Sequence, residues 1–83
     1  MYNIDFTPSS EKDFLKLPAE AQKRIKAVLE RARIRPQAHF ERLVGDPSYK
    51  LRAGDYRIIA DIHHDKFVIL VIEVGHRRNI YDR

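Results

Sequence analysis

Apolar residues follow two different periods along the chain, and the change of period separates a helical part from a strand part. Between Pro18 and Pro36 they recur every three or four positions, which predicts one apolar stripe on a single helix. From Tyr49 onward the period becomes two, which is typical of strands with one buried face. The stripe consists of Ala21, Ile25, Val28, Leu29 and Ala32.

The N-terminal residues predict a short strand followed by a short helix. Residues 2–6 alternate enough for a strand, and Thr7 followed by Pro8 is typical of an N-cap and a first helical turn. Phe14 and Leu15 are expected to point inward from this helix. The Leu17-Pro18 pair interrupts it, so the two helices should form a hairpin that lies on a sheet.

Residues 37–48 predict a connector with a helical turn around Phe40 and Leu43, and three strands follow it. Gly54-Asp55 predicts a tight turn between the first two of these strands. We therefore expect an α+β fold in which residues 1–83 form one domain. Its N-terminal strand, helical hairpin and three-stranded antiparallel meander should form a small, mostly antiparallel sheet with the helices on one face. The meander strands are expected at 49–53, 56–62 and 67–74.

Composition narrows the class of protein. The chain has 83 residues, a formal net charge of +4 and no cysteine, which excludes a disulfide framework and Cys-ligated zinc. No apolar run approaches the length of a membrane span and no signal peptide is recognised, so we expect a cytoplasmic protein without a membrane partner. The positive charge is compatible with a polyanionic partner.

Strand alternation predicts a basic surface on the side of the sheet that has no helices. If Gly54-Asp55 closes a two-residue hairpin, Arg52 pairs with Arg57 and Lys50 pairs with Ile59. Like charges across a strand pair cost up to about 1 kcal/mol, so a purely structural sheet would normally mix signs here. At this point a binding surface and three solvated basic residues on an open sheet face are both open. The opposite, core face is expected to carry Tyr49, Leu51, Ala53, Tyr56, Ile58, Ala60 and Ile62, continued by Phe67, Ile69 and Val71.

The C-terminal segment should add to this basic surface. A regular ladder pairs Arg57 with Ile72, and it places Val74 and then His76 on the basic face, with Gly75 allowing the chain to bend. Converging cations beside an aromatic ring suit phosphates and stacked bases. The residues expected to meet are Lys50, Arg52, Arg57, His76, Arg77 and Arg78, with Tyr81 at the rim.

The stretches "YKLRAGDYRIIADI" and "FVILVIEVGHRRNIY" resemble the C-terminal half of the RelE/ParE superfamily, toxins of type II toxin–antitoxin systems. The preceding strand and helical hairpin fit as well, so the resemblance covers nearly the whole chain and favours the RelE-like branch. It implies a helical hairpin on one side of a small sheet and a basic groove on the other. For that branch it also implies ribosome-dependent cleavage of mRNA in the A site.

The resemblance also implies roles for individual residues. The lysine before the glycine turn falls on Lys50, the arginine after the turn tyrosine on Arg57, the arginine after the strand-ending glycine region on Arg77, and the terminal tyrosine on Tyr81. Arg52 occupies a further basic position of the motif. Two positions depart from it, because Ser48 and His76 stand where some members have lysine.

The chemistry implied is attack of the RNA 2′-OH on the neighbouring phosphate, with no metal or cofactor. Such a reaction needs a base, an acid and stabilisation of the extra negative charge. Arginine does not deprotonate, so Arg57 and Arg77 are assigned to charge stabilisation. Arg52 and Arg78 are assigned to substrate binding, and Lys50, Tyr81 and His76 remain for proton transfer.

The partners implied are a cognate antitoxin, the ribosome and mRNA. We expect the toxin alone to be a monomer and to form a hetero-oligomer with an antitoxin that wraps it with an amphipathic segment. Two alternatives stay open at this point. One is a ParE-like inhibitor of DNA gyrase, and the other is a non-catalytic member that binds RNA or the antitoxin without cutting.

Overall fold

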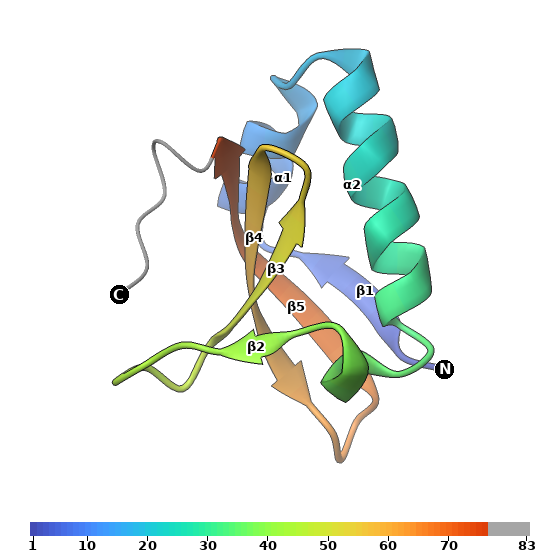
Figure 1. Cartoon of the computed structure of the whole chain (residues 1–83), viewed down its shortest axis with the longest axis vertical. Coiled ribbons are helices and arrows are strands. Elements are labelled where there is room, and N and C mark those ends of the chain that lie inside the picture. Colours follow the sequence, from blue (N-terminus) through green and yellow to red (C-terminus); the bar gives the residue numbers. More distant parts are fainter. Residues whose placement is uncertain (77–83) are drawn as a thin grey trace.

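The computed structural model describes residues 1–76, which form a five-stranded sheet with two helices on one face (Figure 1). The strand order is β1-β5-β4-β3-β2, with β1 parallel to β5 and every other pair antiparallel. The α+β prediction is therefore confirmed. The elements are β1 (Asn3–Phe6), α1 (Pro8–Leu15), α2 (Ala19–Ala32), the 3-10 helix η1 (Pro36–Ala38), β2 (Glu41–Arg42), β3 (Tyr49–Ala53), β4 (Tyr56–His63) and β5 (Val68–His76).

Helix α1 is capped as its sequence predicts. The Thr7 hydroxyl accepts a hydrogen bond from the Ser10 backbone N–H at 3.1 Å, and Pro8 occupies the first turn. Ser10 is fully buried, and its own hydroxyl donates to the Val71 carbonyl oxygen at 2.7 Å. This bond fixes α1 to β5, in the middle of the sheet.

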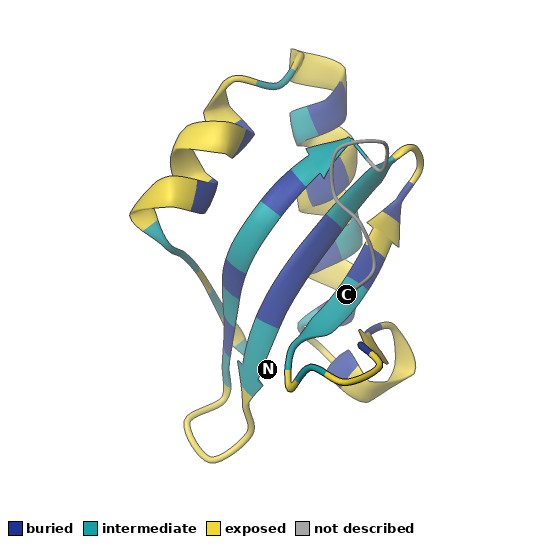
Figure 2. Ribbon diagram, turned by 90° about the vertical axis from the view of Figure 1, so that its left-hand side faces the viewer, coloured by how far each residue is buried: buried dark blue, intermediate teal, exposed yellow. Residues whose placement is uncertain are grey.

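The core lies between the helices and one face of the sheet, with α1 packed on β5 and α2 on β3. In Figure 2 the most buried stretches follow the central strands, while the outer sides of the helices are exposed. Two expectations for the core were wrong. Leu15 is 64% exposed because it follows Phe14 around the helix, away from the sheet, and Phe67 is 56% exposed because it lies in the β4–β5 turn with φ of 54°. The buried core consists of Phe14, Ile25, Leu29, Ala32, Phe40, Leu51, Ala53, Ile58, Ala60, Ile69, Val71 and Val74.

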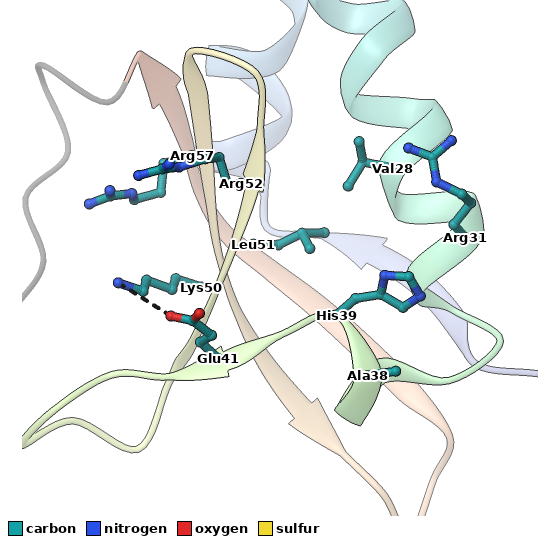
Figure 3. Close-up of a pocket in the computed structure, with 9 residues that line it drawn as sticks. All are labelled: Val28, Arg31, Ala38, His39, Glu41, Lys50, Leu51, Arg52 and Arg57. Carbon is teal, nitrogen blue, oxygen red and sulfur yellow. Dashed lines mark ion pairs between the residues drawn. The ribbon is translucent and has the colours of Figure 1, made fainter.

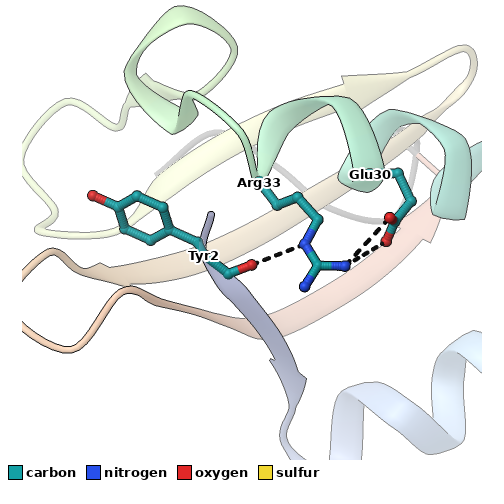
Figure 4. A network of polar contacts seen from close by, with 3 residues as sticks. All are labelled: Tyr2, Glu30 and Arg33. Atoms are coloured by element: carbon teal, nitrogen blue, oxygen red, sulfur yellow. Dashed lines mark hydrogen bonds and ion pairs between the residues drawn. The ribbon is translucent and has the colours of Figure 1, made fainter.

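The C-terminal end of α2 is joined to β1 by a small polar network (Figure 4). Arg33 Nε donates to the Tyr2 carbonyl oxygen at 2.9 Å, and Arg33 Nη1 pairs with the Glu30 carboxylate at 3.0 Å. The backbone N–H of Tyr2 donates in return to the Arg33 carbonyl oxygen at 2.9 Å.

Within the described residues, no helix is both long enough and apolar enough to cross a membrane.

The connector differs from its prediction. A 3-10 turn at Pro36–Ala38 takes the place of the expected helical turn, and Glu41–Arg42 forms a short strand that pairs with Tyr49 and Lys50. Phe40 joins the main core, while Leu43 packs on Ile59 from the opposite face of the sheet. The connector therefore extends the sheet beyond β3 and brings new side chains close to Lys50.

Strand β5 contains a bulge that the sequence analysis missed. Ile59 pairs with Glu73 but Ala60 pairs with Val71, so Ile72 is an extra residue with no partner of its own in β4. Beyond it every residue of β5 faces the side opposite to that expected. Arg57 pairs with Gly75 and not with Ile72, because the hairpin closes at His63 and Val68, which shifts β5 by two residues, and the bulge adds a third. Val74 pairs with Ile58 and is buried in the main core.

Candidate active site

The three cations of β3 and β4 lie on the same side of the sheet, as strand alternation predicts. Arg52 pairs with Arg57 and Lys50 pairs with Ile59. Figure 3 shows all three basic side chains extending to the same side of these strands. The Gly54-Asp55 turn sets this register, because Ala53 and Tyr56 close the hairpin on either side of it.

A groove of about 480 Å³ wraps the outer edge of β3 (Figure 3). Strand β2 pairs only with Tyr49 and Lys50, so within the described residues no strand covers β3 from Leu51 to Ala53 on that side. The groove therefore reaches from the cations on the helix-free face to α2 on the other. Its lining residues are Val28, Arg31, Ala38, His39, Glu41, Lys50, Leu51, Arg52 and Arg57.

Lys50 forms an ion pair that the sequence analysis did not foresee. Its Nζ lies 3.7 Å from Glu41 Oε2, across the β2–β3 pair. The Glu41 side chain is 74% exposed, so the pair contributes at most about 1 kcal/mol and an entering phosphate can displace it. Glu41 is the one carboxylate among the described residues that line the groove.

Ser48, where the family resemblance implied a lysine, supports a neighbouring carboxylate. Its hydroxyl donates to Asp61 Oδ1 at 3.0 Å, and its backbone N–H donates to Asp46 Oδ1 at 2.9 Å. Asp61, on β4, therefore has a neutral hydrogen-bond partner from the residue before β3.

The expected position of His76 was wrong. Because of the bulge at Ile72, His76 pairs with Tyr56 and shares the face of that residue, opposite to Arg57. Its ring packs edge-on against the Tyr56 ring with centroids 5.6 Å apart. Arg77, Arg78 and Tyr81, the other C-terminal residues assigned to the site, lie outside the described residues.

The histidines of the β4–β5 turn do not form a metal site. His64 Nδ1 is hydrogen-bonded to the Tyr2 hydroxyl at 2.8 Å. Within residues 1–76 no three histidine, aspartate or glutamate side chains are grouped closely enough to hold a metal ion.

The open groove is lined by arginines, whose charge is fixed, and by one lysine. Guanidinium groups present planar pairs of N–H donors that match two oxygens of a phosphate. Lys50 supplies an amine that can exchange a proton, which the arginines cannot. Such a site can bind an extended polyanion and stabilise extra negative charge on one of its phosphates.

Comparison with known proteins identifies the family. The family model described as the ParE toxin of the type II toxin–antitoxin system parDE matches residues 4–81. The chain belongs to this family. The mRNA interferase toxin RelE of Escherichia coli K12 is 30% identical over 79 residues, which is 92% of this chain and 83% of RelE. The RelE/ParE resemblance is thus confirmed, and the chain is the toxin of a type II toxin–antitoxin module.

Solved RelE structures confirm that the fold is shared. The isolated E. coli RelE toxin superposes with a TM-score of 0.78 at 31% identity, covering 92% of this chain and 84% of that one. RelE in the intact E. coli RelBE toxin–antitoxin complex gives a TM-score of 0.78 at 31% identity, covering 92% and 96%. The RelB–RelE antitoxin–toxin complex of Methanococcus jannaschii gives 0.72 at 28% identity, covering 94% and 95%.

Sequence reasoning missed three lining residues, Arg31, His39 and Glu41. Arg31 was visible only as one of several cations on the polar side of α2. His39 and Glu41 lay in a segment read as a connector, and only the pairing of β2 with β3 brings them to the groove.

Proposed function

We propose that this toxin is an endoribonuclease that cleaves mRNA and so inhibits translation. The observation that carries the proposal is the groove around Lys50, Arg52 and Arg57, in a chain whose E. coli relative is named an mRNA interferase. A polyanionic substrate fits the excess of positive charge in the groove. The open edge of β3 leaves room for an extended, unpaired strand.

The reaction we propose is internal transesterification of the RNA backbone. The 2′-oxygen loses its proton, forms a bond to the adjacent phosphorus, and the bond from phosphorus to the 5′-oxygen breaks. The products are a 2′,3′-cyclic phosphate and a 5′-hydroxyl that takes up a proton. Arg57 stabilises the extra charge on the phosphate oxygens, and Arg52 holds the backbone.

Proton transfer is assigned to Lys50 and Tyr81, and Arg77 and Arg78 are assigned to the phosphates. His76 is the third candidate for proton transfer, and its contact with Tyr56 makes it the weakest. We therefore expect a positioning role for His76 at the end of β5.

The proposal includes the ribosome as a scaffold. Holding the mRNA bent for in-line attack is an orientation effect that can exceed the contribution of proton transfer. This fits a site whose described part has one lysine and no paired acid and base of fixed geometry. We place the activity in the cytoplasm, with a cognate antitoxin as the partner that controls it, as in the RelB–RelE complexes.

Substitution of Arg57 tests the proposal. Arg57→Ala should lower mRNA cleavage on translating ribosomes by at least about 100-fold, because a charge-stabilising donor is lost. Primer extension on extracted mRNA measures the cleavage. The matched control is Lys26→Ala, which removes a cation from α2 that lies over the Phe14 ring, 5.9 Å from its centroid and away from the groove. Equal cleavage by wild type and Arg57→Ala would refute the assignment.

A second candidate is favoured by the name of the family model, which is that of the ParE toxin. A ParE-like inhibitor of DNA gyrase would keep the fold and need no RNA-cutting groove. Growth arrest would then come with DNA damage and intact mRNA, and it would survive Arg57→Ala. A non-catalytic RNA-binding member would retain mRNA binding and leave both mRNA and DNA intact.

A further inference from the structure

We propose that Arg31 and His39 form a second nucleotide subsite, so that a single-stranded RNA crosses the outer edge of β3 and is held on both sides of it. The first subsite is the cluster of Lys50, Arg52 and Arg57. The identity of the ligand rests on the proposed function. The position of the subsite rests on the groove itself.

Within residues 1–76, the side chains of Arg31 and His39 make no hydrogen bond or ion pair. Arg33, one half-turn further along the chain, is held by Glu30 and by the Tyr2 carbonyl oxygen. A cation that faces a groove without a protein partner is available for an anionic ligand.

Residues of both clusters line the same groove. Arg31 and His39 line it from α2 and from the residue after η1, while Val28 and Leu51 form an apolar floor (Figure 3). The pairing of β2 with β3 ends at Lys50. Within the described residues, the edge of β3 from Leu51 to Ala53 is therefore open. A ligand chain can therefore pass from Arg52 to Arg31 across this edge without displacing a strand.

The side chains of the second subsite suit a nucleotide in particular. A guanidinium group binds phosphate through two N–H donors and also stacks on a base. An imidazole ring stacks on a base, and the apolar floor favours a flat ring over a hydrated carboxylate. Among the lining residues within 1–76, four cations, Arg31, Lys50, Arg52 and Arg57, face the single carboxylate of Glu41. Single-stranded RNA thus fits better than an acidic peptide.

The test is equilibrium binding of 2′-O-methyl RNA, which cannot undergo 2′-OH attack, measured by fluorescence anisotropy on oligonucleotides of two lengths. Wild type should bind the longer RNA more tightly than one too short to reach both subsites. The double variant Arg31→Ala/His39→Ala should bind the longer RNA at least about fivefold more weakly, since a stacked base and a phosphate contact are lost. It should bind the short RNA as wild type does.

Salt dependence gives an independent readout. The slope of log affinity against log salt for the longer RNA should fall by about 0.7 in the double variant, the value for one phosphate contact on a single strand. Lys26→Ala, on the same helix but outside the groove, should change neither the affinity nor the slope.

Each of the following outcomes would refute the second subsite. If the double variant and Lys26→Ala lose the same affinity for the longer RNA, the loss comes from the reduced net charge and not from a subsite. If the double variant binds both RNAs normally but binds the antitoxin weakly, the groove serves a protein partner. Absence of length dependence in wild type would also refute the inference. In each case, cleavage of mRNA on ribosomes by wild type and its loss in Arg57→Ala would leave the proposed function standing.

Discussion

Two features favour glycine at residue 54, a positive φ and the nearby end of the flexible Arg24 side chain. Gly54 has φ of +63°, a conformation that side chains with a Cβ rarely adopt. A Cβ at this position would also lie 2.5 Å from Arg24 Nη1 on α2. Because Gly54 closes the hairpin that pairs Arg52 with Arg57, this single residue supports the register of the basic groove.

Two glycines allow these reasons to be separated. Gly45 also has a positive φ, +73°, but nothing lies within 4 Å of an added Cβ. We expect Gly45→Ala to lower the free energy of unfolding by about 1 kcal/mol and Gly54→Ala by about 1–2 kcal/mol, measured by urea denaturation. The excess at Gly54 should vanish in an Arg24→Ala background. Its persistence there would show that Arg24 is not the cause.

Two local signals, a helix cap and a tight turn, were read correctly from the sequence. The Thr7 cap and the Gly54-Asp55 turn depend on a few neighbouring residues, and both are confirmed. The pairing of Arg52 with Arg57 follows from the turn alone. That Arg31 has no hydrogen-bond or ion-pair partner within residues 1–76 could not be read in this way, because it depends on which residues of other elements surround it.

At the scale of elements, the bulge in β5 determines which face of the sheet the last residues of the strand occupy. One extra residue, Ile72, turns Val74 into the core and His76 toward Tyr56. An unbroken run of apolar residues gives no sign of where a bulge lies. Simple alternation therefore assigned the residues of β5 after Ile72 to the wrong face of the sheet. The same limit applies to β2, whose two residues become a strand only by pairing with β3.

Deletions in β5 test this view of the bulge. Without Ile72, Val71 and Glu73 keep their partners in β4 and alternation becomes regular, so the deletion should cost less than about 2 kcal/mol of unfolding free energy. Deletion of Val74 puts Gly75 opposite Ile58 and leaves a cavity in the core, which should cost about 2–5 kcal/mol. Urea denaturation compares the two. Equal losses would contradict the assigned register.

At the scale of the whole molecule, the two faces of the sheet differ in what they carry. One face buries the core beneath α1 and α2, and the other presents Lys50, Arg52 and Arg57 beside an open edge. A net charge of +4 by itself indicates little about binding, and it is the grouping of three cations beside one groove that supports the proposed polyanion site. The small core and the exposed groove fit a toxin of a toxin–antitoxin module, whose harmful surface must be open to its target and to its antitoxin.

We propose that this toxin cuts RNA by attack of the 2′-OH within the basic groove. Cleavage of mRNA programmed on ribosomes, with and without a single 2′-deoxy nucleotide on the 5′ side of the scissile bond, followed by analysis of the new ends, tests this step. We expect a 2′,3′-cyclic phosphate from the normal mRNA and no cleavage at the substituted bond. Cleavage of the 2′-deoxy mRNA at the same bond and rate would contradict it.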